Sequence, residues 1–431
     1  MKYYSLNKKS PFVSFKEAAI KGQAPDKGLY FPEQIPTLEQ SFIEGLMEME
    51  NAEIAFRVIK PYISGDIPDE ELFCIVSEAI NFTIPLVKLN ENIYTLELFH
   101  GPTLAFKDVG ARFMSRCLGY FLKGENKKVT VLVATSGDTG GAVANGFYEV
   151  DGVEVIILYP SGKVSPVQEK QLTTLGKNIH ALEVEGTFDD CQQMVKKAFA
   201  DQEVNNKLFL TSANSINVAR WLPQQVYYFF AYKQWPDKDN PPVISVPSGN
   251  FGNLCAGMLA KESGLPVRHF IAACNANDVI PRYLQTAELC PMEAIPTLSN
   301  AMDVGDPSNF IRILEMFQNR IDELKKNLSS FSISDTDTLE TIKKVYMKSG
   351  YLLDPHGAVG YSSLQKYLDH YPELKGIFLE TAHPVKFPDA LEKITDKKIE
   401  VPEILHSIMD QEKKSIRIKA GYNFMKEYLM R

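Results

Sequence analysis

The sequence lacks the features that mark membrane, secreted and nucleic-acid-binding proteins. No segment approaches the roughly 18 consecutive apolar residues of a membrane span, and the opening MKYYSLNKKS lacks the apolar core of a secretory signal. The 46 lysines and arginines are outnumbered by 54 aspartates and glutamates, and the net charge of -8 argues against nucleic acid as a partner. We therefore expect a cytoplasmic protein. An anionic small-molecule ligand stays compatible with this charge, because the field of a pocket is local.

Cysteine is also scarce, with six residues that lie far apart in the sequence. None forms a Cys-x-x-Cys pair, so the pattern favours neither a zinc site nor a redox motif. A disulfide framework is unexpected in a chain of 431 residues. We expect a reducing compartment and no bound metal ion.

What the sequence does contain is an alternation of short apolar runs and helical segments. The runs carry no alternating polar residues, which is typical of parallel strands covered on both faces. They lie at residues 129–134, 153–159, 179–184, 208–211, 243–246, 270–273 and 377–379. This order predicts an α/β protein with mostly parallel sheets flanked by helices.

Other segments give local predictions. Thr187 and Asp190 have the spacing of a helix capping box, and Ser165 precedes a proline at a first helical position. Residues 319–347 are charged and amphipathic and are expected as surface helices. Residues 235–242 (WPDKDNPP) are expected as an exposed connection.

The first 90 residues differ from the rest of the chain. They are rich in proline and carry helical patterns at residues 41–60 and 69–81. A chain of 431 residues is long enough for two or three domains. We expect residues 1–90 to form a mainly helical N-terminal domain and residues 91–431 to form the main region.

A glycine-rich turn, SGNFGN at residues 248–253, follows one predicted strand and leads into a helix. Free N–H groups of such a turn bind anions, and glycine lets the backbone approach phosphate oxygens closely. No Gly-Lys-Ser/Thr follows, so the turn is not a Walker sequence. A tight turn without a ligand is the alternative.

A second turn of this kind, ATSGDTGG at residues 134–141, lies between another strand and helix. Its hydroxyls and N–H groups suit a carboxylate or a phosphate. The alternative is simple capping of the helix by Ser136, Asp138 or Thr139. Two anion-type turns in one chain suggest a ligand with two anionic ends.

One lysine stands inside a mainly apolar segment, LELFHGPTLAFKDVG at residues 96–110. Burial of Lys107 would favour its neutral, nucleophilic amine, which Schiff-base chemistry needs. Lys107 could equally be an exposed lysine at a helix start, and composition alone favours that alternative.

Two further predicted strands end in polar residues. Thr381 and His383 follow the strand at 377–379, where ligands of open α/β sheets bind. His383 is either a general base or a structural hydrogen-bonding residue. Asn214, Ser215 and Arg220 follow the strand at 208–211 and together suit a phosphate ester, although a polar surface loop is the alternative.

Taken together, these segments resemble the threonine synthase family, which belongs to the fold-type II enzymes that use pyridoxal 5'-phosphate (PLP). The resemblance covers nearly the whole chain, with motifs in the family's order and at similar spacing. The motifs are APDKGLY (24–30), HGPTLAFKD (100–108), SGDTG (136–140), NSIN (214–217) with Arg220, SGNFG (248–252), MDV (302–304) with PSNF (307–310), DPHG (354–357) and TAHP (381–384).

The resemblance implies a fold, a reaction and an assembly. The implied fold has two open, mostly parallel sheets, with a smaller mobile subdomain at about 110–205 and a large subdomain at about 206–431. The implied reaction converts O-phospho-L-homoserine and water to L-threonine and phosphate, with PLP as cofactor. A monomer or a homodimer is expected.

The resemblance also implies roles for individual residues. Lys107 would bind PLP covalently and then move protons. The other residues implied to bind the cofactor are Gly249, Asn250, Phe251, Gly252 and Asn253, for its phosphate, and Thr381, for its pyridine nitrogen. The residues implied to bind the substrate are Ser136, Gly137, Asp138 and Thr139, for its carboxylate, and Asn214, Ser215 and Arg220, for its phosphate.

Asp138 departs from the pattern of many fold-type II enzymes, which have asparagine in this loop. Threonine synthases of this longer type are expected to share the aspartate. A contact between Asp138 and the phenolic oxygen of PLP would be repulsive, because both groups are anions.

Three other functions fit parts of the sequence. A threonine or serine dehydratase shares the implied fold but needs neither the substrate-phosphate cluster nor the N-terminal domain. A catalytically inactive PLP-binding regulator would not need the full set of reactive residues that is present. A nucleotide-binding protein would need a Walker lysine, which both glycine turns lack.

Overall fold

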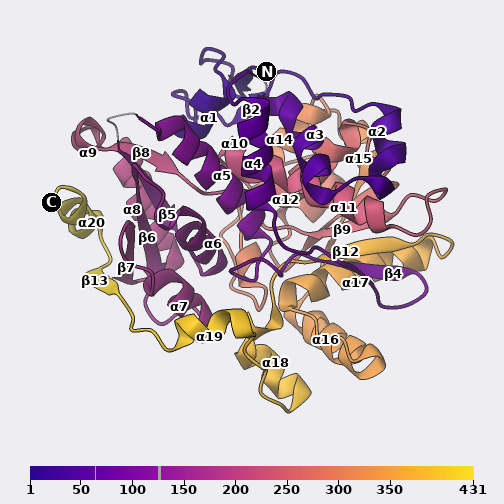
Figure 1. Ribbon diagram of the computed structural model, residues 1–431. Coiled ribbons are helices and arrows are strands. Elements are labelled where there is room, and N and C mark those ends of the chain that lie inside the picture. Colours follow the sequence, from indigo (N-terminus) through magenta and orange to yellow (C-terminus); the bar gives the residue numbers. More distant parts are fainter. Residues whose placement is uncertain (64, 125–127) are drawn as a thin grey trace.

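Two helix-covered sheets form the body of the protein in a computed structural model that describes residues 1–63, 65–124 and 128–431 (Figure 1). A small antiparallel sheet of β1 (Tyr3–Ser5) and β2 (Tyr30–Pro32) lies near the N-terminus. The prediction of an α/β protein with mostly parallel sheets is confirmed. None of the helices in the described ranges has the length and hydropathy that a bilayer crossing requires.

The first large sheet is five-stranded and entirely parallel, in the order β13-β7-β6-β5-β8. Its strands are β5 (Val129–Ala134), β6 (Val153–Pro160), β7 (Ile179–Glu185), β8 (Phe209–Ser212) and β13 (Ser415–Lys419). Val131 pairs with Val155 and joins the core beneath α5 (Lys107–Leu122) and α6 (Asp138–Phe147). Leu132 pairs with Ile156 and packs on the opposite face with α8 (Phe188–Ala200) and α20 (Tyr422–Leu429). Both faces are therefore apolar, which explains the unbroken apolar runs.

The second large sheet has the order β11-β10-β9-β12-β4-β3 and is parallel except for the pair β3–β4. Its strands are β3 (Leu86–Lys88), β4 (Ile93–Glu97), β9 (Val243–Pro247), β10 (His269–Cys274), β11 (Leu328–Ser332) and β12 (Gly376–Glu380). Helix α17 (Pro355–His370) packs against β9, β10 and β12. Successive residues of β12 enter different cores, Ile377 with α12 (Gly252–Glu262) and Phe378 with α17.

The remaining helical elements connect and cover these sheets. The α-helices are α1 (Phe15–Lys21), α2 (Gln40–Glu44), α3 (Asn51–Ile63), α4 (Asp69–Ala79), α7 (Pro166–Thr173), α9 (Gln202–Lys207), α10 (Val218–Trp221), α11 (Val226–Gln234), α13 (Val279–Thr286), α14 (Phe310–Met316), α15 (Ile321–Asn327), α16 (Asp335–Ser349), α18 (Pro388–Thr395) and α19 (Glu403–Met409). The 3-10 helices are η1 (Gly45–Glu48), η2 (Leu222–Gln225), η3 (Asn300–Met302) and η4 (Pro384–Lys386).

All seven strands expected from apolar runs are present, with ends that differ by at most one residue. Both predicted helix starts are confirmed as capping boxes, Ser165 with Gln168 at α7 and Thr187 with Asp190 at α8. The helical pattern at 69–81 corresponds to α4.

Three local expectations hold only in part. Residues 41–60 are not one helix, because Met49 is extended (φ -87°, ψ 145°) and separates α2 and η1 from α3. Residues 319–347 include the strand β11, whose serines hide its pattern although it pairs with β10. The segment 235–242 is not fully exposed, since Trp235 is 1% exposed and its Nε1 donates to the carbonyl of Asn240 at 3.0 Å.

The chain crosses between the two large sheets more often than expected. Strands β8 and β13 belong to the five-stranded sheet, although both fall in the range expected for the large subdomain. Figure 1 shows the yellow C-terminal segment passing from α18 through α19 to β13 and α20 beside the magenta strands. The division into an N-terminal domain and two subdomains stays a prediction.

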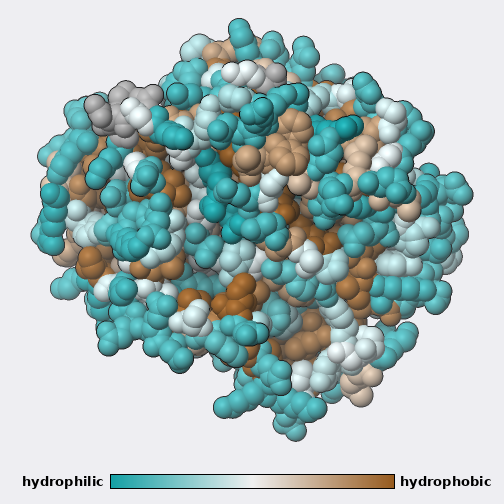
Figure 2. Space-filling model, viewed as in Figure 1, coloured by the Kyte–Doolittle hydropathy of each residue, from teal (hydrophilic) through white to brown (hydrophobic). Residues whose placement is uncertain are grey.

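The face drawn in Figure 2 is mainly hydrophilic, and hydrophobic residues show only in small separate areas. Most apolar side chains are instead in the buried cores between sheets and helices. These cores fix the strands and helices whose connecting loops form the site described below.

We expect Gly357→Ala to destabilise the protein, because α17 lies directly on β12 at this glycine. An added Cβ would stand 1.7 Å from Oε2 of Glu380, a buried carboxyl group whose Oε1 already accepts the amide of Asp354. Such overpacking costs roughly 1–3 kcal/mol of unfolding free energy, measurable as a lower Cm in urea. Gly45→Ala is the control, since its Cβ would approach only the end of the Met49 side chain. Equal stability of the two variants would contradict this packing.

Candidate active site

Loops from both large sheets surround one cavity of about 1290 Å³. Four of these loops follow the carboxyl ends of β5, β8, β9 and β12, the edge where open α/β sheets bind ligands. Apart from Gly137, every residue predicted to bind cofactor or substrate lines the cavity. The N-terminal segment also contributes to the wall, with Lys21, Gln23, Pro25 and Lys27.

Lys107 is the first residue of α5 and its side chain lines the cavity, so it is not the surface lysine of the alternative interpretation. The amide of Phe106 donates to the carbonyl of Thr381 at 3.0 Å, which ties the start of α5 to the end of β12. Behind it, the buried Asp108 accepts hydrogen bonds from the amide and the hydroxyl of Thr103. The backbone on both sides of Lys107 is therefore anchored.

Burial lowers the pKa of the Lys107 amine to about 8. The carboxylate of Asp138 acts in the opposite direction, whereas the charges of Lys386 and Arg220 lower this pKa further. A neutral amine is thus accessible near physiological pH, as a nucleophile or general base requires.

The glycine loop 248–253 turns sharply into α12. Phe251 has a left-handed backbone (φ 63°), and the helix begins at Gly252. A Cβ on Gly249 would lie 2.6 Å from Cα of Met302, so this position accepts no side chain without movement. The amide Nδ2 of Asn250 donates to Oγ of Ser215 at 2.7 Å. The loop therefore contacts the polar segment after β8 directly.

The turn after β5 differs from a simple capped helix start. Oγ1 of Thr135, and not a side chain of Ser136, Asp138 or Thr139, accepts the amides of Gly137 and Gly140 at 2.9 Å each. Gly137 has φ 139°, and a Cβ there would overlap the amide group of Gln168. Gly137 thus forms the turn and does not line the cavity.

Asp138 is buried and its Oδ1 accepts two hydrogen bonds, from Nζ of Lys386 at 2.7 Å and from Nε2 of Gln168 at 3.0 Å. Burial by itself raises the pKa of the Asp138 carboxyl. The charges of Lys386 and Lys107 and the two hydrogen bonds outweigh burial, and the net pKa is lowered. Asp138 is therefore ionised at physiological pH.

Arg220 lies on α10 and is buried, with Nη1 donating to the carbonyl of Ala213. Burial lowers its pKa to about 10, partly offset by Asp108, so the guanidinium keeps its charge at neutral pH. Its Nε and Oδ1 of Asn214 are buried without a partner in the described parts of the chain. Unpaired buried polar groups are costly, and here they lie on the cavity wall, where a ligand can satisfy them.

His383 has a structural environment. Its Nδ1 accepts the amide of Val385 at 3.1 Å and so caps η4, and its ring meets Phe99 edge to face. Burial lowers its pKa to about 4, which keeps the imidazole neutral at physiological pH. These contacts favour the structural interpretation over a general base.

Sequence reasoning missed three polar residues of this region. Lys386 and Gln168 hold Asp138, and His356 lines the cavity while its Nδ1 bonds to Asp354 at 2.6 Å. Lys386 stands between Val385 and Phe387, a setting as apolar as that of Lys107, and this was the available signal. For Gln168, the Ser-x-x-Gln spacing with Ser165 signals a helix cap but not the contact with Asp138.

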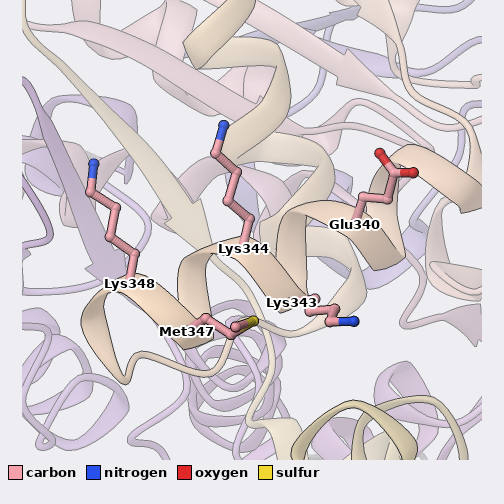
Figure 3. Close-up of a pocket in the computed structure, with 5 residues that line it drawn as sticks. All are labelled: Glu340, Lys343, Lys344, Met347 and Lys348. Atoms are coloured by element: carbon pink, nitrogen blue, oxygen red, sulfur yellow. The ribbon is translucent and has the colours of Figure 1, made fainter.

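A second hollow lies on α16 and gathers no comparable groups. Figure 3 shows Lys344 and Lys348 extending to one side of the helix and Lys343 to the other. Their charges do not converge on one point.

Comparisons with known proteins match these features. Residues 79–378 match the family model described as pyridoxal-phosphate dependent enzyme. Residues 2–80 match that of the threonine synthase N terminus, and residues 357–429 that of the threonine synthase C-terminal part. A threonine synthase of Haemophilus influenzae is 46% identical over 406 residues, which cover 94% of each chain. The chain belongs to the threonine synthase family.

Solved threonine synthases have the same fold. The crystal structure from Escherichia coli superposes with a TM-score of 0.93 at 42% identity, over 100% of this chain and 99% of the other. A PLP-bound threonine synthase from Brucella melitensis gives a TM-score of 0.94 at 36% identity, over 100% and 98% of the two chains. The protein is accordingly a PLP-dependent lyase of threonine biosynthesis, and the predictions of family, fold, activity and cofactor are confirmed.

The residues of the cavity fit PLP. Lys107 offers an amine of lowered pKa, and the N-terminus of α12 follows a glycine loop in which Gly249 leaves no room for a side chain. Nδ2 of Asn253, in the glycine loop, is a buried donor without a partner among the described residues. Oδ1 of Asn253 is already held by the hydroxyls of Tyr227 and Tyr228, at 2.6 Å each, so this side chain is fixed.

We expect the amine of Lys107 in cofactor-free protein to titrate near pH 8, well below an ordinary lysine. Because burial disfavours the ammonium form, the fraction of neutral amine rises as the pH rises through about 8. Reductive ¹³C-methylation followed by NMR titration would measure this value. Lys343, exposed on α16, gives a surface-lysine signal in the same spectra with which the Lys107 curve is compared. Two identical titration curves would show that the Lys107 site is not desolvated.

Proposed function

We propose that the cavity converts O-phospho-L-homoserine and water into L-threonine and inorganic phosphate. The observation that carries this proposal is that Lys107 shares one cavity with two distinct groups of anion-binding residues. One is the glycine loop before α12, and the other is Arg220 with Asn214 and Ser215. A PLP enzyme that acts on an unphosphorylated amino acid needs only one phosphate site, whereas a phosphorylated substrate requires a second.

The proposed cofactor contacts follow from the loops. Residues 249–253 bind the phosphate of PLP through backbone N–H groups at the start of α12, where the helix dipole favours an anion. Thr381, which lines the cavity, would hold the pyridine nitrogen with its hydroxyl, a partner that would not favour protonation of that nitrogen. Bound to Lys107, PLP supplies an electron sink for the charge that develops at the substrate's α-carbon.

The proposed substrate contacts lie at the N-terminus of α6 and on α10. The hydroxyls of Ser136 and Thr139 and the first amides of α6 take the carboxylate. Arg220, Asn214 and Ser215 take the phosphate, with the unpaired Nε of Arg220 as a charged donor. Gly137 shapes the turn that carries these groups. Asp138 contributes its negative charge, which acts on the amine of Lys107.

Lys107 moves the protons in the proposed sequence. Its amine removes the α-proton of the substrate. The departing phosphate takes the β-proton as the bond between the γ-carbon and the phosphate oxygen breaks, and the bonding electrons leave with phosphate, which Arg220 holds. The ammonium of Lys107 then protonates the γ-carbon. Water adds its oxygen to the β-carbon and gives a proton to the Lys107 amine, and Lys107 passes this proton to the α-carbon as threonine leaves.

We further infer that the protein works in the cytoplasm as a monomer or homodimer, without nucleic acid. The six cysteines support a reducing compartment, since all of them are free thiols and four are buried. The net charge of -8 supports the absence of a nucleic-acid partner.

Lys107→Ala tests the attachment of the cofactor. We expect a folded protein that has lost the visible absorption of lysine-bound PLP and has no threonine-forming activity. Borohydride reduction followed by peptide mapping measures which lysine carries the cofactor. A variant that still traps PLP and still releases phosphate from O-phospho-L-homoserine would assign the wrong lysine.

Arg220→Ala tests the division between two phosphate sites. A guanidinium–phosphate pair contributes on the order of 1.5–3 kcal/mol, so kcat/KM on O-phospho-L-homoserine should fall roughly 10- to 150-fold while PLP stays bound. Arg220→Lys should recover only part of the loss, because an ammonium lacks the planar fork. Binding of a substrate analogue without phosphate is the control and should barely change. Loss of PLP from the variant would place Arg220 at the cofactor phosphate instead.

A further inference from the structure

Lys386 is a buried lysine that the proposed reaction does not use. It ends η4, shortly after β12 of the six-stranded sheet, whereas its partner Asp138 begins α6, shortly after β5 of the five-stranded sheet. Their side chains are 0% and 5% exposed, and Nζ lies 2.7 Å from Oδ1. The pair thus bridges the two sheets beside the cavity.

The two charges of this pair depend on each other. A buried ammonium is unfavourable unless it is paired, and removing one member of a buried ion pair leaves the other charge uncompensated. Nε2 of Gln168 donates to the same carboxylate oxygen at 3.0 Å and fixes its orientation. The carboxylate of Asp138 is therefore held by two donors from different elements, α7 and η4.

The pair also acts on Lys107. Asp138 favours the charged form of Lys107, and Lys386 disfavours it. The other charged group that acts on Lys107 is Arg220, on α10. The charge of Lys386 also acts to lower the pKa of Asp108, whose carboxyl accepts a hydrogen bond from Thr103. It acts in the same direction on the pKa of His383, which is neutral.

We propose that Lys386 is a positioning residue of the active site, and that with Asp138 it presents Lys107 with a neutral ion pair in place of a bare carboxylate. The inference rests on the proposed attachment of the cofactor to Lys107. It also removes the repulsion expected between Asp138 and an anionic ligand, because the negative charge is compensated within the pair.

The consequence concerns the proton on the Lys107 nitrogen. A bare carboxylate would hold that proton more tightly, and the nitrogen would then be a poorer nucleophile and base. With Lys386 in place, the charge of Asp138 is compensated and the nitrogen gives up its proton more easily. The pair therefore lets a buried carboxylate share the cavity with a catalytic amine.

The test is a double-mutant cycle on the holoenzyme, with the visible absorption of bound cofactor followed against pH. Lys386→Met should move the midpoint of the spectral transition up by about one pH unit, a tenfold change in proton affinity. Asp138→Asn should move it down, because an uncompensated Lys386 remains. The double variant is neutral like the native pair, so its midpoint should return close to that of the unmodified enzyme.

Two further variants separate electrostatics from packing. Lys386→Arg keeps the charge and should keep the midpoint, and Lys375→Met removes a half-exposed lysine paired with Asp237 and should leave it unchanged. If Lys386→Met does not fold, the double variant decides alone: a native midpoint supports the proposal, and a displaced one overturns it. A midpoint that stays fixed in Lys386→Met while the melting temperature falls would reduce Lys386 to a packing role. Failure of the cofactor attachment itself is recognised separately, because Lys107→Ala would then keep the visible band.

Discussion

The hydrogen bond from the amide of Phe106 to the carbonyl of Thr381 is the contact on which the rest of the site depends. It fixes the first residue of α5 against the end of β12, and the isolated bridge between Ala105 and Ala382 adds to this junction. Because β12 lies in the interior of the six-stranded sheet, Lys107 takes its position from the sheet and not from a flexible loop. This one junction therefore positions both Thr381, proposed to contact the pyridine nitrogen of PLP, and Lys107, proposed to bind PLP covalently.

The opposite wall of the cavity belongs to the other sheet. The loop after β5 contributes the turn at Gly137 to this side of the site, and the loop after β8 contributes the polar segment before α10. The hydrogen bond from Asn250 to Ser215 connects this polar segment to the glycine loop. The two groups proposed for two different phosphates are therefore neighbours in direct contact. A change in one loop is transmitted to the other through a single hydroxyl.

The sequence predicted the strands well where both faces of a sheet are covered, because such strands are continuous apolar runs. It did not predict the short strands β1 and β2, nor β3 and β4, whose sequences LVK and IYTLE include polar residues. It also did not predict β11 or β13, since edge strands such as LSSFS and SIRIK carry polar residues on their exposed positions. Among site residues, Lys107 and the glycine loop were recognisable from local pattern and resemblance. Lys386 was not, because its function comes from a partner 248 residues earlier in the chain, and such pairing is a property of the fold.

The late position of β13 bears on how the protein is made. This edge strand pairs with β7, from which it is separated by more than half of the chain, including the strands β9 to β12 of the six-stranded sheet. During synthesis, β5 to β8 emerge before β9 to β12, and the edge of β7 stays open until β13 arrives. An open edge is a template for pairing between chains, so the nascent protein is exposed to misassembly at this place until synthesis is nearly finished.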